Sequence, residues 1–409
     1  MKRLLFIAPG YLPYTFSENL CNGKLVYALT EAGFEVDVIS KVDEGPAYDK
    51  EWNEPWTRLK ENCYEVSYEN GGKIRRLCDF IKCSLEMSIT PINGIRWAER
   101  AYKKALDLHE KRRYDAILTR SPNDIPHIVG YKFSKNTGVK WIANWNDPAS
   151  TIWPEPYTHH FNAWQVAVNN RYIKMCLKYA DVNTFPSNSL RQHYISHFPF
   201  LKNKHTEVIP HIALADSIVI PRHEPEKEIF TMCHSGNMSV ERDPELMFQA
   251  MCRLIEKGYK DIRLDIMGHA NQFVEGLVAK YNLQDYVKFI GGYPYLEAVS
   301  LLQKYSVLVL LEAKLEEGIF FPSKFTDYAQ AHRPILAVSP QNGFAKDTIE
   351  RYGGGIAVNN KNVDDIEQGI LRLYQEWKGG ALHSTYSTNR LYGSFSANTV
   401  VNQYKNITD

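Results

Sequence analysis

The chain reads EEGIFFPSKFTDY over residues 316–328, between two short apolar runs, VLVLL at 307–311 and PILAV at 334–338. Short apolar runs bounded by turn residues are typical of buried parallel strands. The segment between them predicts an acidic loop followed by a helix. Pro322 suits the first position of that helix because its missing N–H would be unpaired there. Strand, loop, helix and strand in this order form the βαβ unit of a parallel sheet.

The start of this predicted helix has the features of an anion-binding site. Free N–H groups and the helix dipole attract negative charge at a helix start, and Lys324 adds a positive charge suited to phosphate. Asp327 shares a helix face with Lys324 at i, i+3 spacing. The pair is therefore either part of a phosphate site or an exposed ion pair worth only a few tenths of a kcal/mol.

Alternating apolar runs and helical patterns extend over most of the chain. Repeated βα units with short buried strands predict parallel, doubly wound sheets and an α/β fold. Prolines and a charged run interrupt the alternation between about residues 209 and 228, which indicates a linker. The expected organisation is a Rossmann-like N-terminal domain (1–208), a linker (209–228), a Rossmann-like C-terminal domain (229–385) and a tail (386–409).

The composition limits the classes of function. A chain of 409 residues is long enough for two or three domains. Its 48 basic and 47 acidic residues nearly cancel, so the charge gives no general attraction to nucleic acid. Seven cysteines occur without a Cys-x-x-Cys pair, which favours free thiols in a reducing cytoplasm over disulfides or zinc. No apolar run approaches the roughly 18 residues that span a membrane.

Loops that follow the predicted strands are the candidate sites, because ligands of doubly wound sheets bind beyond the carboxyl ends of the strands. Gly236, after the strand at 229–234, allows a ligand to approach the backbone closely. Arg242 precedes the next helix, where its guanidinium group can donate two hydrogen bonds to a phosphate. Each loop by itself also fits an ordinary turn with a surface arginine. Together they predict a site, and its residues before the 316–328 segment are Gly236, Asn237, Arg242, Gly268, Gly292 and Tyr293.

In their order along the chain, these segments resemble family 4 glycosyltransferases, which are retaining, nucleotide-sugar-dependent enzymes of the GT-B fold. The matching segments are GN (236–237) with RDP (242–244), LDIMG (264–268), VKFIGG (287–292) and PSKFTDY (322–328) with RPILA (333–337). The resemblance covers the C-terminal domain and the start of the chain well, and residues 41–110 poorly. It implies two Rossmann-like domains whose sheets face each other across a cleft, with a tail helix that crosses back to the first domain.

The resemblance also implies a role for each matching residue. Arg242 and Lys324 neutralise the diphosphate of the donor, with Ser323 at the helix start. Asp327 stands where the family usually has a glutamate that binds the ribose hydroxyl groups. The other implied contacts are Glu316 or Glu317 to the donor sugar, Gly318 and Ile319 as backbone N–H donors, and Tyr293 near the base.

The acceptor is expected at the N-terminal domain, where the loop after the strand at 140–144 holds Asn146 and Asp147. The family often places a histidine or an aspartate here, facing the sugar, so Asp147 is the first candidate and Asn146 the second. An Asx turn before Pro148 would explain the same residues without a function.

The implied reaction transfers a sugar from a nucleoside diphosphate sugar to a hydroxyl acceptor, with retention of configuration. A glycan or lipid-linked glycan is the expected acceptor, in polysaccharide biosynthesis. The resemblance implies that no metal cofactor is needed, and no Asp-x-Asp motif occurs. Two alternatives stay open. One is a GT-B-fold sugar-nucleotide epimerase, and the other is a non-catalytic binding subunit, since Ser17-Glu18-Asn19 replaces a Gly-Gly pair common in the family. A dehydrogenase is disfavoured because no Gly-x-Gly-x-x-Gly follows a strand.

Residues 73–85 have apolar side chains at 74, 77, 78, 81 and 85 and several basic neighbours, which predicts an amphipathic helix with a cationic face. Such a helix either contacts an anionic membrane that carries a lipid-linked acceptor or covers the first domain as a solvated helix. We therefore expect a cytoplasmic protein, with peripheral contact at the inner face of the membrane if the first interpretation holds.

Overall fold

The computed structural model describes residues 2–41, 49–68, 72–87, 94–121 and 124–409. Contacts within the chain divide it into two compact units, Met1–Pro210 with Val400–Asp409, and His211–Thr399. Most of the expected linker is grouped with the second unit. The N–H of Glu226, for example, donates to the carbonyl oxygen of Lys304 (2.9 Å).

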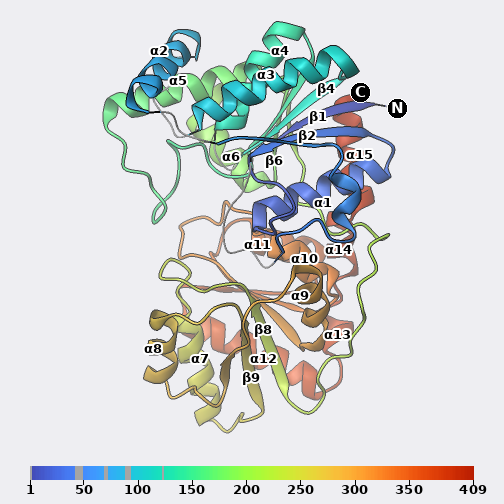
Figure 1. The fold of residues 1–409 in the computed structure, drawn as a ribbon. Helices are drawn as coiled ribbons and strands as arrows, with labels where there is room; N and C mark the ends of the chain where they lie inside the picture. Colours follow the sequence, from blue (N-terminus) through green and yellow to red (C-terminus); the bar gives the residue numbers. More distant parts are fainter. Residues whose placement is uncertain (1, 42–48, 69–71, 88–93, 122–123) are drawn as a thin grey trace. The chain divides into compact units, whose positions relative to one another are not determined.

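The first unit contains a seven-stranded parallel sheet in the order β3-β2-β1-β4-β5-β6-β7 (Figure 1). Its strands are β1 (Arg3–Ile7), β2 (Glu35–Lys41), β3 (Cys63–Val66), β4 (Ala116–Arg120), β5 (Lys140–Asn144), β6 (Val182–Phe185) and β7 (Thr206–Val208). Its described α-helices are α1 (Ser17–Glu31), α2 (Lys73–Met87), α3 (Ile95–Arg112), α4 (Ile125–Thr137), α5 (Ala163–Tyr179) and α6 (Asn188–His197), together with most of α15 (Ala397–Thr408).

The second unit contains a six-stranded parallel sheet in the order β10-β9-β8-β11-β12-β13. Its strands are β8 (Phe230–Ser235), β9 (Ile262–Met267), β10 (Val287–Phe289), β11 (Val307–Leu311), β12 (Ile335–Ser339) and β13 (Gly355–Asn359). Its helices are α7 (Glu245–Glu256), α8 (Gln272–Lys280), α9 (Tyr295–Leu301), α10 (Lys324–Gln330), α11 (Phe344–Tyr352), α12 (Val363–Lys378), α13 (Leu382–Thr385) and α14 (Asn389–Phe395).

Both sheets are doubly wound, so the predicted α/β fold with two parallel sheets is confirmed. In the first sheet the strand order reverses between β1 and β4, and in the second between β8 and β11. Ligands of such sheets bind where the order reverses, beyond the carboxyl ends of the two central strands. The loops after β8 and β11 are therefore the first place to look for a site in the second unit.

The core of the second unit explains why its strands are apolar throughout. Alternate side chains of a strand point to opposite faces of the sheet. Met232 and Val309 accordingly lie in one buried apolar cluster, while Cys233 and Leu308 lie in the other. Because helices cover both faces, neither face favours polar residues.

The helix after the acidic loop starts later than the sequence predicts. It begins at Lys324, and Pro322 lies two residues before it. Ser323 already has a helical backbone conformation, but its side chain makes no capping hydrogen bond. The helix α10 has only seven residues, so a charged side chain rather than its dipole is the main feature at its start.

Within the described ranges, none of the helices is both long and apolar enough to cross a membrane.

Candidate functional site

The loops after β8 and β9 pack closely together, and Gly236 lies against Lys324. Gly236 has φ +114°, and a Cβ atom placed on it would lie 2.5 Å from the Nζ atom of Lys324. A Cβ atom on Gly268 would lie 2.6 Å from the carbonyl oxygen of Gly236. The side chain of Asn237 fastens the two loops together, since its Oδ1 accepts from the N–H of His269 (2.9 Å). The structure therefore brings four predicted site residues into contact: Gly236, Asn237, Gly268 and Lys324.

Two positive charges meet at this point without an acid that neutralises them. Burial, together with the charge of Arg242, lowers the pKa of Lys324 to about 7, while Asp327 acts in the opposite direction. Burial also lowers the pKa of His234 to about 3, and the charges of Lys324 and Arg242 add to this effect. In the described part of the chain, neither Lys324 nor Arg242 takes part in an ion pair, so the site favours an anion.

Tyrosines hold α10 in place beneath these charges. The hydroxyl of Tyr328 accepts from the N–H of Ser235 (2.9 Å) and donates to the carbonyl oxygen of Val309 (3.2 Å). The hydroxyl of Tyr295, on α9, donates to Oδ1 of Asp327 (2.7 Å). The orientation of Asp327 is therefore fixed by a neighbouring helix.

The acidic loop differs from the expectation in two respects. Glu317 is exposed, and the side chain of Glu316 is 99% exposed and forms an ion pair with Lys361 (2.9 Å). The N–H of Gly318 donates to the carbonyl oxygen of Asn342 (2.8 Å), and that of Ile319 to the carbonyl oxygen of Glu317 (3.0 Å). Neither N–H is therefore free to bind a ligand in this conformation of the loop.

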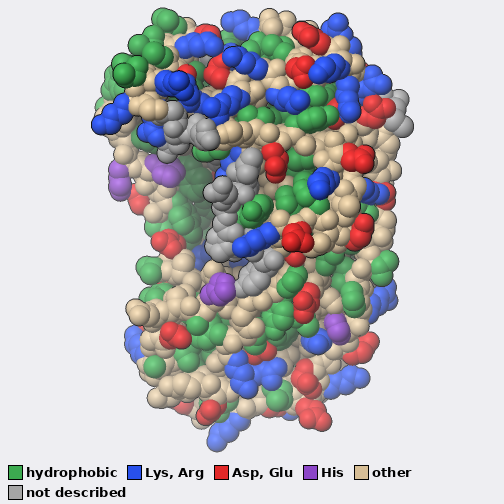
Figure 2. All heavy atoms as spheres, viewed as in Figure 1, with side chains coloured by type: hydrophobic (Ala, Val, Ile, Leu, Met, Phe, Trp, Pro, Cys, Tyr) green, Lys and Arg blue, Asp and Glu red, His purple; other side chains and the backbone are tan. Residues whose placement is uncertain are grey.

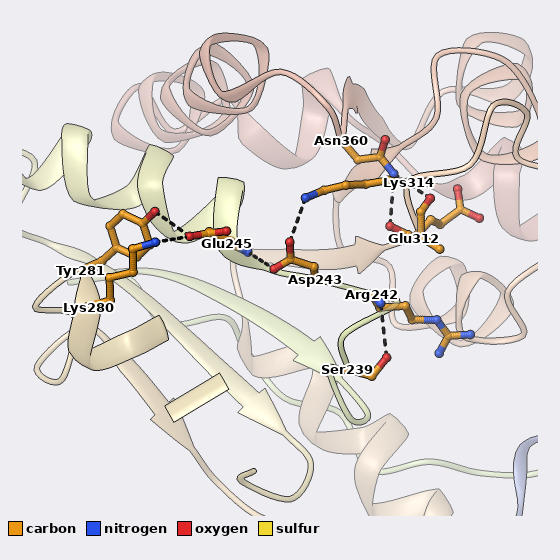
Figure 3. Close-up of polar contacts among 10 residues, drawn as sticks. Ser239, Arg242, Asp243, Glu245, Lys280, Tyr281, Glu312, Lys314 and Asn360 are labelled. Carbon is orange, nitrogen blue, oxygen red and sulfur yellow. Dashed lines mark hydrogen bonds and ion pairs between the residues drawn. The ribbon is translucent and has the colours of Figure 1, made fainter. Parts of the chain in front are cut away.

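A buried acid that the sequence analysis missed lies directly after β11. Glu312 is 7% exposed, and burial raises its pKa to about 8 although the charge of Arg242 opposes the change. Its carbonyl oxygen accepts from Nδ2 of Asn360 (3.1 Å) (Figure 3). The signal in the sequence was a single acid directly after the apolar run VLVLL, at the carboxyl end of a central strand.

An ion pair connects the two loops of the site. Nζ of Lys314, after β11, lies 2.8 Å from Oδ2 of Asp243, after β8. Figure 3 shows Arg242, Asp243, Glu312 and Lys314 gathered on these neighbouring loops. The contact keeps Arg242 and Glu312 on loops that are tied to each other.

The remaining predicted residues of the second unit line the same edge of the sheet. Gly292 and Tyr293 are partly buried in the loop after β10, and Tyr293 packs against the apolar cluster that contains Phe325. Ser323 is partly buried, and its carbonyl oxygen accepts from the hydroxyl of Thr326 (2.8 Å). Their proposed contacts with a nucleotide stay predictions.

In the first unit, Asn146 belongs to a buried polar cluster near the strand-order reversal between β1 and β4. Its Nδ2 donates to Oε1 of Glu18 (2.8 Å), and its N–H donates to the hydroxyl of Ser121 (2.9 Å). Arg120, at the end of β4, donates to Oδ1 of Asn146 (3.3 Å). Asp147 is only partly buried, and its carbonyl oxygen accepts from the hydroxyl of Tyr194 (3.0 Å). The internal bonds of Asn146 give it a structural role.

Among the described residues, no group of three or more His, Cys, Asp and Glu side chains is arranged to hold a metal ion.

A comparison with known protein families gives a match within the second unit. Residues 218–388 match the family model described as glycosyl transferases group 1. The matched region contains the Gly236, Arg242, Glu312 and Lys324 positions. A search of curated protein sequences found no match.

Solved structures with the same fold extend the comparison to the whole chain. Sucrose-phosphate synthase from Thermosynechococcus elongatus is 16% identical, with a TM-score of 0.69 over 100% of this chain and 98% of that chain. Anabaena HepE in complex with UDP and glucose is 14% identical, with a TM-score of 0.67 over 100% and 99%. A variant of S. aureus TarM in complex with Fondaparinux, alpha-GlcNAc-glycerol and UDP is 11% identical, with a TM-score of 0.66 over 100% of both chains. The chain therefore has the GT-B fold.

Proposed function

We propose that this protein is a retaining glycosyltransferase of family 4, which moves a sugar from a nucleoside diphosphate sugar to a hydroxyl acceptor. The observation that carries the proposal is the pair of positive side chains, Arg242 and Lys324, that have no ion-pair partner among the described residues. They lie at the strand-order reversal of a domain that matches the glycosyl transferases group 1 model. An anion of high charge, such as a diphosphate, satisfies both side chains at once.

The charges of the site fit the chemistry of sugar transfer. When the bond between sugar and phosphate breaks, negative charge grows on the nucleoside diphosphate that leaves. Positive groups already placed at those oxygens stabilise this charge most in the transition state. A bound diphosphate would also raise the pKa of Lys324 from about 7, because an adjacent anion favours the charged form. In the proposed mechanism, the leaving phosphate then accepts the proton of the acceptor hydroxyl.

The other predicted residues have proposed roles around this centre. Asp327, held by the hydroxyl of Tyr295, binds the ribose hydroxyl groups, and Tyr293 lies near the base. Glu317 or Glu316 contacts the sugar after a rearrangement of the acidic loop that also frees Gly318. The complexes of HepE and TarM with UDP make UDP the first nucleotide to test.

The acceptor is proposed to bind the first unit near Asp147. A glycan or lipid-linked glycan is the proposed acceptor, and the TarM variant was solved with Fondaparinux and alpha-GlcNAc-glycerol. The reaction is proposed to proceed without a metal cofactor, so that turnover should survive a chelator.

The helix α2 supports a proposed contact with the inner face of a membrane. Its apolar side chains Ile74, Leu77, Ile81 and Leu85 are 80%, 57%, 49% and 83% exposed. Where Figure 1 draws α2, Figure 2 shows hydrophobic and basic side chains next to one another. Apolar and cationic groups on one helix suit an anionic lipid surface. Replacing Ile74 and Leu85 by serine should abolish cosedimentation with vesicles that contain anionic lipid, and equal binding by this variant would refute the contact.

The donor site is tested by a screen of nucleoside diphosphates and their sugars, since a ligand raises apparent stability according to its affinity. Binding of at least one of them, and its loss in Arg242→Ala and Lys324→Ala, is expected. Lys361→Ala, which removes an exposed lysine paired with Glu316, is the matched control. Equal binding by all variants would refute the site. Conversion of nucleotide sugars without an acceptor would favour the epimerase, and binding without any turnover would favour a binding subunit.

A further inference from the structure

Glu312 is the one acid in the second unit that combines deep burial, an unpaired oxygen and a position at the proposed donor site. It directly follows β11, one of the two central strands at the strand-order reversal. Its Oε2 atom is buried and has no hydrogen-bond partner among the described residues. Buried polar atoms are nearly always paired, so an unpaired carboxylate oxygen at this position calls for a partner.

Hydrogen bonds fix the backbone of Glu312, and its carboxyl group lies in a buried position. The N–H of Glu312 donates to the carbonyl oxygen of Val338 (3.0 Å), and its carbonyl oxygen accepts from Asn360. Gly318 lies beside the carboxyl group, because a Cβ atom placed there would be 3.7 Å from Oε2. The carboxyl group is therefore shielded from bulk water, with Glu312 only 7% exposed.

Among the charged groups that the structure describes around Glu312, Arg242 is the one that interacts with it. Of the charged residues in the described ranges, Arg242 is the one that perturbs the pKa of Glu312. Lys314 is paired with Asp243, and Lys361 with Glu316, on the loops on either side. The charge of Arg242 also lowers the pKa of two other groups of the proposed site, Lys324 and His234.

We propose that Glu312 is a third ionisable member of the diphosphate site: its neutral carboxyl group donates a hydrogen bond to the bound diphosphate, and its ionised form opposes the charge of the diphosphate. This inference rests on the proposed function, and it assigns to Glu312 a direct contact that neither the motifs nor the comparisons suggest. The residue would make donor binding sensitive to alkaline pH.

Chemistry and charge agree with this assignment. An ionised carboxylate only accepts hydrogen bonds, whereas a protonated carboxyl group also donates one. Burial raises the pKa of Glu312 to about 8, so the neutral form dominates at pH 7 and the ionised form at pH 9. If UDP binds only when Glu312 is neutral, the apparent affinity for UDP is proportional to the fraction of Glu312 that is protonated. The apparent Kd of the wild type should then rise about tenfold between pH 7 and pH 9 through Glu312 alone.

The test compares UDP binding by the wild type, Glu312→Gln and Glu312→Met at both pH values, using calorimetry. Glutamine keeps the shape and a donor N–H but cannot ionise, and methionine removes the donor as well. At pH 9 we expect Glu312→Gln to bind UDP about tenfold more tightly than the wild type, and at pH 7 about equally. Glu312→Met should bind about tenfold more weakly than Glu312→Gln at pH 7. Glu350→Gln, an exposed acid on α11, is the control and should follow the wild type.

A second measurement does not depend on how well the variants fold. At pH 9 the wild type should take up close to one more proton per UDP bound than Glu312→Gln, as seen by calorimetry in buffers of different ionisation enthalpy. Lys324 also titrates in this range, but it does so in both proteins and cancels in the comparison. If the ratio of UDP affinities at pH 7 and pH 9 and the proton uptake are the same in the wild type and in Glu312→Gln, Glu312 has no role in binding. The donor site would still stand. If neither UDP nor inorganic pyrophosphate binds the wild type at either pH, the donor site itself is wrong.

Discussion

Removing the charge of Lys324 should make the protein more stable while it abolishes donor binding. The side chain is held against Gly236, close to the positive charge of Arg242, and no ion pair among the described residues compensates it. Lys324→Met keeps the length of the aliphatic chain and removes only the ammonium group. A lysine that served the fold would give the opposite result, so the sign of the change distinguishes a binding site from a structural contact.

The magnitude follows from the pKa of Lys324, which burial lowers from 10.5 to about 7. A difference of one in pKa corresponds to about 1.4 kcal/mol. A shift of this size therefore lowers the free energy of unfolding by at most about 4 kcal/mol at pH 7. Lys324 is partly exposed, and solvent screening reduces the effect to about 1–2 kcal/mol. Between pH 7 and 10.5 the unfolded chain binds the proton more tightly than the native protein, so the wild type gains stability with rising pH. The advantage of Lys324→Met should therefore shrink over this range.

Urea unfolding followed by circular dichroism, at several pH values, measures the difference. Lys361→Met is the matched control, because it removes an exposed lysine from an ion pair and should change stability by less than about 0.5 kcal/mol. UDP binding should be lost in Lys324→Met and kept in the control. Destabilisation by Lys324→Met with an unchanged m-value, or UDP binding as tight as in the wild type, would refute this reasoning.

Two further substitutions test the surroundings of Lys324. Gly236→Ala combines a positive φ with a Cβ atom 2.5 Å from Nζ of Lys324, so it should cost about 1–3 kcal/mol of stability and weaken UDP binding. Gly258→Ala, with φ +100° but no atom within 4 Å of the new Cβ, should cost stability only, and an equal loss of UDP binding there would contradict the packing argument. Tyr295→Phe removes the 2.7 Å hydrogen bond to Asp327 and should weaken UDP binding by about 1 kcal/mol with little change in unfolding. If Tyr295→Phe binds UDP as tightly as the wild type, Asp327 does not contact the donor.

Continuous apolar runs made several buried strands predictable. The runs VLVLL and PILAV correspond to β11 and β12. Four strands were not predicted, because their sequences lack a long apolar run: β3 (CYEV), β6 (VNTF), β7 (TEV) and β13 (GIAVN). Burial on both faces, rather than strand formation itself, produces the pattern that sequence analysis detects.

The site was predicted less completely than the fold. Glycine and a basic residue in a loop after a strand are visible in the sequence, and Gly236 and Lys324 indeed lie in contact. The sequence did not show which acid is buried and which is exposed, because this depends on contacts between distant loops. Glu316 is exposed, whereas Glu312, four residues earlier, is buried beside Gly318. Spacing along a loop of irregular conformation does not determine which side chain turns inward.

The last segment of the chain is part of the first unit, and this has a consequence for synthesis on the ribosome. Val400, Val401, Tyr404 and Ile407 are buried, yet they are translated only after the whole of His211–Thr399. Domains generally fold during synthesis in the order in which they emerge. Here the unit that emerges first must wait for its last helix, so the unit that emerges second can complete its core before it. Until then, the apolar surface that α15 covers stays open to chaperones.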